Sequence, residues 1–432
     1  MSLKKLIALA SVVLIAAVVP ASASNDPGFN KQWGLAKIQA EQAWATGSGS
    51  GIVIAVVDTG VDLAHEDLKD KIVPGIDCVG GCREGSSGQD AEGHGTHVAG
   101  IAAAATSNNR GIAGTAPTAR IMPVRVLDEN GRGTAADISS GIRWAADHGA
   151  KVINLSLGGP AQAFSGPGST FGSALEYAWS RGVIPVVAAG NQFLLSSGYS
   201  EHNAIVVTAT DRNDAKPDFA SVVGSAKWGM AAPGGASNVD PANPFGVTTN
   251  TNDIFSTYWD YEKPNDHNLY AYAPGTSMSA PFVSGAAAVL RGLGLSPQAT
   301  VDRLLATADD VGPSGRDSTF GYGRLNLARA VQGLGSSSSS GSSGTGVAPG
   351  KKRGGTIAAA TPAATLSPSA PAPLPATPTA SVVPEPSDPG SQPLGGGASE
   401  DEGIDLWPML ALVLLAGSST GLFMHHRARS GG

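Results

Sequence analysis

Five apolar segments separated by helix-like stretches constrain the fold of this chain more than any other feature. An uninterrupted apolar run of this length predicts a strand covered on both faces. Helix-like stretches lie between the first four, so the alternation predicts an α/β fold. We expect a doubly wound, mostly parallel sheet with helices on both faces and reactive groups at the carboxyl ends of strands. The apolar segments are residues 51–58, 119–127, 151–157, 183–189 and 204–210, and the helix-like stretches are 97–105, 134–148 and 170–181.

Composition allows one large domain with appendages, or two domains. The chain has 432 residues, of which 41% are hydrophobic, enough for a sizeable core. Its 28 Lys and Arg against 35 Asp and Glu give a net charge of -7, which argues against nucleic acid as a partner. Two cysteines are too few for a disulfide scaffold.

The amino terminus has the pattern of a secretory signal peptide over residues 1–23. Lys4 and Lys5 precede an apolar run over 6–19, and small residues follow up to Ala23. Cleavage there starts the mature chain at residue 24, outside the cytoplasm. In that compartment Cys78 and Cys82 either close a small disulfide loop or remain thiols, and the sequence leaves both open.

The carboxyl-terminal quarter predicts a membrane tether. Residues 335–403 are rich in Ser, Gly, Ala, Thr and Pro and cannot form a core, which predicts a disordered stalk. Residues 404–424 are predominantly apolar and have the length of a transmembrane helix. The basic tail, 425–432, is expected on the cytoplasmic side. The preceding domain, 24–334, is therefore expected to be anchored to the cell membrane from outside.

Three short segments supply the groups of nucleophilic acyl transfer. Asp58 ends the first apolar segment, His94 precedes a helix-like stretch, and Ser277 begins a small-residue segment of helical character. Separately, such residues are more often turn residues or helix caps. Together they offer a hydroxyl nucleophile, an imidazole base and an orienting carboxylate, in the chain order Asp, His, Ser.

The segments around these residues resemble those of the subtilisin family of serine proteases, and within it the thermitase-like branch. The resemblance runs from about residue 25 to 334 and implies the subtilisin-like version of the α/β fold. It rests on the residues Val56-Val-Asp-Thr-Gly-Val61, His94-Gly-Thr-His-Val-Ala-Gly-Ile101 and Gly275-Thr-Ser-Met-Ser-Ala-Pro281, together with Asn25-Asp-Pro-Gly-Phe29 and Gln32-Trp-Gly34 at the start.

The resemblance assigns the catalytic roles. Asp58 is implied as the orienting acid, His94 as the general base and Ser277 as the nucleophile. Asn191, in a glycine turn after an apolar segment, resembles the family's oxyanion residue, which acts with the backbone N–H of Ser277. A plain turn residue would be the ordinary interpretation of Asn191 without the other motifs.

Substrate contacts are implied for Ser156, Leu157 and Gly158, where the family pairs an extended peptide with the protein backbone. An ordinary strand end is the alternative. His97 is expected to be packed structure and His65 to lie in a solvated loop. Without a recognisable third ligand, the pair of histidines at 94 and 97 does not indicate zinc.

Calcium is the cofactor that the resemblance implies, in a structural role, whereas no catalytic metal or organic cofactor is expected. The implied ligands offer carboxylate, amide and carbonyl oxygens, which suit calcium. A loop without metal is the alternative. These ligands are Asp26, Asp67, Ala105, Asn108, Arg110 and Ile112. Asp77 and Gln89 align with a second family site, but the insertion at Cys78–Cys82 alters that loop, so we do not predict it.

These features together predict a secreted, membrane-tethered serine endopeptidase with a monomeric catalytic domain and polypeptide substrates. One alternative is a narrow-specificity processing protease, like the mycosins of type VII secretion, which share the anchored layout. Another is a catalytically silent binding module. The presence of Asp58, His94, Asn191 and Ser277 argues against a silent module, since an unused site is free to lose any of them.

Overall fold

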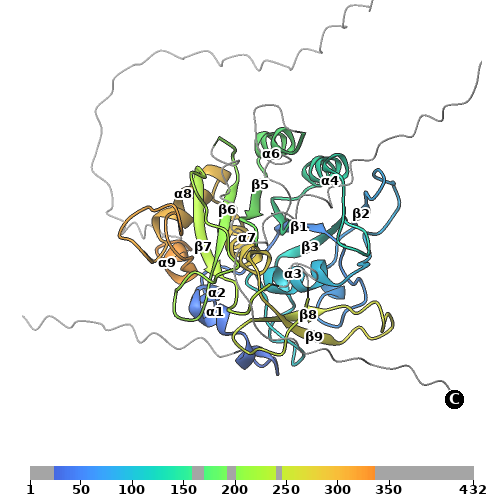
Figure 1. Ribbon diagram of the computed structural model, residues 1–432, viewed down its shortest axis with the longest axis horizontal. Helices are drawn as coiled ribbons and strands as arrows, with labels where there is room; N and C mark the ends of the chain where they lie inside the picture. The colour runs from blue at the N-terminus through green and yellow to red at the C-terminus, as the bar shows by residue number, and fades with distance from the viewer. Residues whose placement is uncertain (1–23, 158–169, 192–200, 240–245, 336–432) are drawn as a thin grey trace, which may run out of the picture. The chain divides into compact units, whose positions relative to one another are not determined.

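The computed structural model describes residues 24–157, 170–191, 201–239 and 246–335 (Figure 1). The expected signal peptide, Gly158, the stalk beyond residue 335, the membrane segment and the basic tail lie outside these residues. Within the described ranges, no helix combines the length and apolarity needed to cross a membrane.

A seven-stranded parallel sheet forms the centre of the described part of the chain, which confirms the predicted α/β fold. Its strand order is β2-β3-β1-β4-β5-β6-β7. Each of the five predicted segments contains one of these strands, whereas β2 and β7 were not predicted. The strands are β1 (Val53–Asp58), β2 (Ile76–Asp77), β3 (Arg120–Arg125), β4 (Val152–Leu155), β5 (Ile184–Ala188), β6 (Ile205–Thr210) and β7 (Trp228–Pro233).

Helices pack on both faces of this sheet because its strands are apolar on both. In β1, Ile54 and Val56 belong to the core shared with α3 (His94–Ala103) and α7 (Thr276–Gly292). The alternate residues Ala55 and Val57 belong to a second core, shared with α4 and α6. This alternation is the period of two expected of a strand. The second pair of helices spans Ala135–Asp147 (α4) and Thr170–Ser180 (α6), as predicted to within a residue.

The remaining elements surround the sheet (Figure 1). An antiparallel hairpin, β8–β9, lies against α3, and short helices precede β1 or follow α7. Their bounds are β8 (Ile254–Tyr258), β9 (Leu269–Ala273), α1 (Trp33–Lys37), α2 (Ala40–Trp44), α8 (Pro297–Ala306) and α9 (Leu327–Val331), with 3-10 turns η1 (Phe29–Lys31) and η2 (Lys69–Lys71).

The strand order places a topological switch point at the carboxyl ends of β1 and β4. These two strands are neighbours, with Val56 opposite Asn154. From β1 the chain continues to β2 and β3 on one side, and from β4 it continues to β5 on the other. Ligand sites in open α/β sheets lie where the connections diverge in this way. Asp58, the last residue of β1, and Ser156, just after β4, both lie at this point.

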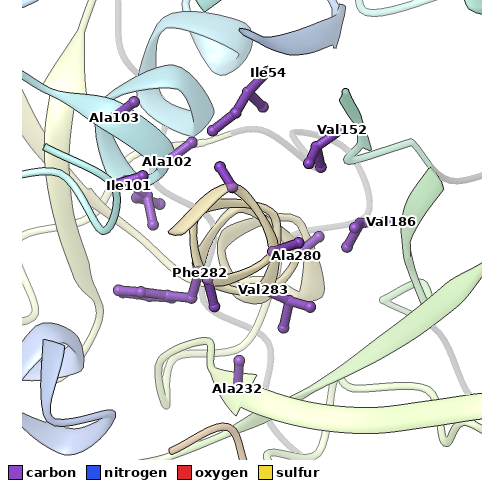
Figure 2. Close-up of a cluster of buried hydrophobic side chains, with 14 of the residues drawn as sticks. Ile54, Ile101, Ala102, Ala103, Val152, Val186, Ala232, Ala280, Phe282 and Val283 are labelled. Atoms are coloured by element: carbon purple, nitrogen blue, oxygen red, sulfur yellow. The ribbon is translucent and has the colours of Figure 1, made fainter. Parts of the chain in front are cut away.

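Helix α7 is buried along nearly its whole length. Figure 2 looks along this helix and shows side chains from α3, β1, β4, β5 and β7 around it. All residues from Thr276 to Leu290 are buried. Small side chains make this possible: a Cβ added to Gly285 would lie only 2.5 Å from Cβ of Thr115. The run of Ala, Gly and Ser in the sequence therefore reflects a helix enclosed by protein.

Candidate active site

Asp58 and His94 form a buried pair at the end of β1. The ring nitrogen Nδ1 of His94 lies 2.7 Å from Oδ1 of Asp58, and both side chains are almost fully buried. The backbone N–H of Thr59 donates to the same carboxylate oxygen, at 2.8 Å. Helix α3 can begin this close to β1 because residue 95 is a glycine: a Cβ there would lie 2.0 Å from the carbonyl oxygen of Gly60.

Two opposing effects act on the pKa of His94. Burial lowers the pKa, because it disfavours the imidazolium. The charge of Asp58 and the hydrogen bond from the ring to its carboxylate raise it, and Glu92 and Asp90 add to this. The raising effects prevail, so the pKa of His94 lies above its ordinary value. His94 is thus a base of increased strength despite its burial.

A buried carboxylate, Asp90, organises the loop before His94 and was not singled out in the sequence. Its Oδ1 accepts from Thr59 Oγ1 at 2.8 Å and from the N–H of Gly93 at 3.0 Å, and its Oδ2 accepts from the N–H of Thr96 at 2.9 Å. Burial raises the pKa of Asp90 above its ordinary value, although hydrogen bonds to its carboxylate oppose the rise. Asp90 therefore links the residue after Asp58 to the start of α3. An acid four residues before a helix-opening His was the available signal.

Glu92 is a second acidic neighbour that the sequence did not single out. One carboxylate oxygen of this half-buried residue accepts from the backbone N–H of His94 at 2.8 Å. Burial raises the pKa of Glu92 to about 7, in spite of the opposing charge of His94. Glu92 thus changes charge near neutral pH at the backbone of His94, and its charge acts on the pKa of the ring.

Ser277 is the second residue of α7 and contacts the residue that follows β4. Its side chain is buried and its Oγ donates to the carbonyl oxygen of Ser156, at 3.3 Å. In return, Ser156 Oγ donates to the carbonyl oxygen of Ser277, at 2.7 Å. Leu157, next in the chain, is buried, and Gly158 lies outside the described residues. Of the residues expected to hold substrate, Ser156 therefore contacts the expected nucleophile, and Leu157 follows Ser156 in the chain.

The Asn191 side chain lies beside the start of α7. Its Oδ1 accepts from the backbone N–H of Thr276 at 2.8 Å and from Thr276 Oγ1 at 2.9 Å. Its Nδ2 lies 3.2 Å from the point where a Cβ on Gly275 would stand, and the Ser277 nitrogen lies 3.6 Å from the same point. Two nitrogen donors therefore border the small space that Gly275 leaves open.

The two other histidines near these segments are buried. His97 has the expected packed position: Nε2 lies 3.1 Å from the carbonyl oxygen of Ala271, and burial lowers its pKa to about 3. The prediction for His65 was wrong. This residue is buried, with Nε2 2.9 Å from the carbonyl oxygen of Leu269, because the β8–β9 hairpin covers the loop after β1.

The expected calcium ligands come together around the loop 105–112. Asp26 accepts from the backbone N–H of Asn108 at 2.9 Å, and Asp67 accepts from Asn108 Nδ2 at 2.9 Å and from the N–H of Ile112 at 2.8 Å. The N–H of Arg110 binds Asn108 Oδ1 at 2.9 Å. Ala105 donates its N–H to the Asp67 carbonyl.

The donor set of this loop fits a hard cation, since it offers two carboxylates and an amide oxygen. Burial raises the pKa of Asp67 because it disfavours the charged carboxylate. A bound cation would offset this penalty. No cluster of three or more His, Cys, Asp or Glu side chains occurs among the described residues. The expected set contains two acids, and its remaining ligands are an amide and backbone carbonyls, so that observation does not test it.

A disulfide and two ion pairs stabilise the loop after β2. Cys78 and Cys82 are joined in a disulfide. The carboxylate of Asp77 forms ion pairs with Arg83 and with Arg125, the latter at 3.2 Å. Two guanidinium groups thus neutralise the acid that aligns with the family's second metal site. The structure gives no reason to expect a cation there.

Comparison with known proteins identifies the family. Residues 49–323 match the model of the subtilase family, peptidase S8. Thermitase of Thermoactinomyces vulgaris is 43% identical over 311 residues, which cover 71% of this chain and 99% of thermitase. Subtilisin DY of Bacillus licheniformis is 35% identical over 310 residues, which cover 69% of this chain and 98% of that protein.

Solved structures give the same result. A protease from Pseudoalteromonas arctica superposes with a TM-score of 0.63 at 32% identity, covering 72% of this chain and 99% of the other. Fervidolysin of Fervidobacterium pennivorans, a keratinolytic enzyme related to subtilisin, gives 0.57 at 32% identity, over 72% of this chain and 46% of its own. The chain therefore belongs to the subtilase family and is a subtilisin-like serine endopeptidase.

Proposed function

We propose that Ser277, His94 and Asp58 are the catalytic triad of this endopeptidase and that Asn191 completes its oxyanion hole. The observation that carries this assignment is the buried contact between His94 Nδ1 and Asp58 Oδ1, 2.7 Å long. It lies at the same edge of the sheet as Ser277. Such a contact fixes the tautomer that leaves Nε2 able to accept a proton.

The first half of the reaction forms an acyl-enzyme. Ser277 Oγ attacks the carbonyl carbon of the scissile peptide bond, and His94 Nε2 takes the hydroxyl proton. Asp58 stabilises the imidazolium that results. The negative charge on the carbonyl oxygen is held by the Asn191 amide and the Ser277 backbone N–H. When the C–N bond breaks, His94 passes its proton to the leaving amine.

The second half releases the acyl group with water. His94 removes a proton from the water, whose oxygen forms a bond to the acyl carbon, and the proton returns to Ser277 Oγ as the ester bond breaks. The substrate is an extended polypeptide, which the backbone of residues 156–158 pairs with as an added strand. Ser156 and Leu157 lie immediately after β4, where such pairing is possible.

The nucleophile is tested by Ser277→Ala. We expect kcat for peptide hydrolysis to fall by roughly a million-fold, as it does when the nucleophile of a subtilisin is removed. Labelling by a fluorophosphonate should disappear as well, while the melting temperature stays within a few degrees of that of the unmodified protein. Undiminished hydrolysis by Ser277→Ala would rule out this residue as the nucleophile.

The pH dependence tests the role of His94. Because the base must be neutral, kcat/KM should rise with pH through an apparent pKa above the ordinary histidine value. The negative charge of Glu92 raises the pKa of His94, so Glu92→Gln should move this rise of kcat/KM, the acidic limb of the pH profile, to lower pH. Glu129→Gln removes a charge from an exposed residue outside the site and serves as the control. A limb that moves to higher pH in Glu92→Gln would contradict the assignment.

Calcium is the structural cofactor in this proposal, bound by Asp26, Asp67 and the loop 105–112. When bound, the ion supplies a positive charge that offsets the burial of the two carboxylates. It takes no part in the chemical steps. The protein's contribution is to gather the oxygen donors in one loop, as the hydrogen bonds from Asn108 to both acids indicate.

Removal of calcium should lower the melting temperature. At an ion concentration a hundred times Kd, binding adds about 2.7 kcal/mol to the free energy of unfolding. Asp67→Asn should reduce the difference in melting temperature between samples in calcium and samples in chelator. Asp70→Asn, the same change at an exposed position, should preserve it. Equal melting temperatures of the unmodified protein in calcium and in chelator would exclude the site.

The remaining part of the proposal concerns location. Residues 1–23 direct export, and residues 404–424 hold the exported protease in the cell membrane at the end of the stalk. The supporting observations are the apolar and charged segments of the sequence, which lie outside the described residues.

Fractionation of cells tests the anchor. The full chain should sediment with the membrane fraction, whereas a chain truncated before Ile404 should appear in the medium with its activity intact. The comparison with the full chain controls for expression and export. Retention of the truncated chain in the membrane fraction would contradict an anchor at 404–424.

A further inference from the structure

The first turn of α7 contains a proline that deprives Ser277 of its helical hydrogen bond. In a regular α-helix the carbonyl of one residue accepts from the N–H four residues later. For Ser277 this residue is Pro281, which has no N–H. Ser156 Oγ donates to the Ser277 carbonyl instead, at 2.7 Å. A side chain at the end of β4 thus replaces the missing backbone donor of the nucleophile.

The hydroxyl of Ser156 is itself held by a buried amide. Asn154 Nδ2 donates to Ser156 Oγ at 2.9 Å, and Ser284 Oγ donates to Asn154 Oδ1 at 2.8 Å. The exposed fraction of Ser156, Asn154 and Ser284 is 0% in each case. Buried polar groups of this kind are costly unless they are paired, so these side chains strongly favour one arrangement.

These side chains form a chain of hydrogen bonds in which every donor points in the same direction. Each serine hydroxyl has a single hydrogen. Ser284 donates its hydrogen to Asn154, which donates to Ser156, and Ser156 donates to the Ser277 carbonyl. Asn154 on β4 and Ser156 just after it are two residues apart and face the same way. Ser277 and Ser284 are two helical turns apart on one face of α7. This chain of hydrogen bonds therefore begins and ends on α7, the helix that carries the nucleophile.

We propose that Asn154 is a positioning residue for Ser277, acting through Ser156 and anchored by Ser284. The inference rests on Ser277 being the nucleophile. Because the chain ends on the Ser277 backbone, its loss would shift Ser277 Oγ relative to His94. A misplacement of about 1 Å costs on the order of 100-fold in rate. The effect should therefore appear in kcat rather than in KM.

The test uses Ser284→Ala, Asn154→Ala and the double variant in the full-length protein. We expect kcat and the rate of fluorophosphonate labelling to fall roughly tenfold in Ser284→Ala and roughly 100-fold in Asn154→Ala, with KM within about twofold. The double variant should be no slower than Asn154→Ala, because both changes interrupt one chain.

Ser279→Ala is the matched control. It removes another buried hydroxyl of α7, one that donates to the carbonyl of Pro233 outside the chain of hydrogen bonds. Its kcat should stay within about twofold of the unmodified value. Ser284→Ala covers the case in which Asn154→Ala fails to fold, and the melting temperature of each variant reports folding.

Three results would overturn the inference. They are an unchanged kcat in folded Ser284→Ala, an equal loss in Ser279→Ala, and a loss confined to KM. A failure of the proposed function has a different signature: Ser277 of the unmodified protein would not react with the fluorophosphonate at all. Labelling of the unmodified protein with unchanged rates in the variants would remove the positioning role alone.

Discussion

The enclosure of α7 by protein on all sides is the constraint on which the rest of the structure depends. A helix satisfies most of its backbone groups internally, so it can be buried if its side chains are small. The stretch from Thr276 to Leu290 meets this condition and is buried throughout. Its neighbours are helices α3, α8 and α9 and strands β1, β4, β5, β6 and β7, which Figure 2 shows in part around the helix axis. The position of Ser277 is therefore fixed by the core.

The hydroxyl groups of Thr276, Ser279 and Ser284 on this helix are fully buried, and that of Ser277 nearly so. They therefore find partners on or near the surrounding strands. An unpaired buried hydroxyl costs about 1–3 kcal/mol. The partners of these hydroxyls lie on, or within a few residues of, the carboxyl ends of β4, β5 and β7. The hydrogen bonds thus tie the helix to the same edge of the sheet where Asp58 ends β1. The buried hydroxyls are those of Thr276, Ser277, Ser279 and Ser284.

The sequence predicted the parts of the fold that depend on local pattern. Apolar runs identified the five central strands, and the motifs identified Asp58, His94 and Ser277, which lie at the ends of elements. The edge strands were not predicted. Strand β2 is short, and β7 carries Gly, Pro and Trp in place of a clear apolar run. His65 was misplaced because its burial depends on a hairpin whose Leu269 lies 204 residues later in the chain, about which the local sequence says nothing.

Buried polar partners were the least predictable part of the site. Asn154 is one polar residue in an apolar run, and Ser284 one serine in a run of small residues, so neither has a local signal. Their pairing depends on the approach of β4 to α7, which only the fold provides. Asp90 had a weak local signal in its position four residues before His94, but its partners likewise depend on the fold. Its carboxylate accepts five hydrogen bonds, from Thr59 and from the loop and helix start that follow it.

The carboxylates around His94 show how this edge keeps a buried imidazole basic. Burial disfavours the imidazolium, and a charge at the ring opposes that effect most strongly. Asp58 contacts the ring, while Asp90 and Glu92 bind the backbone of the same loop and act on the ring through charge. Asp90 can stay buried because N–H and O–H donors surround it. Glu92 is half-buried and loses its charge near pH 7 as its pKa is about 7, so the field at His94 weakens in acid. The basicity of His94 thus depends on fixed hydrogen bonds at Asp58 and on a carboxylate that responds to pH.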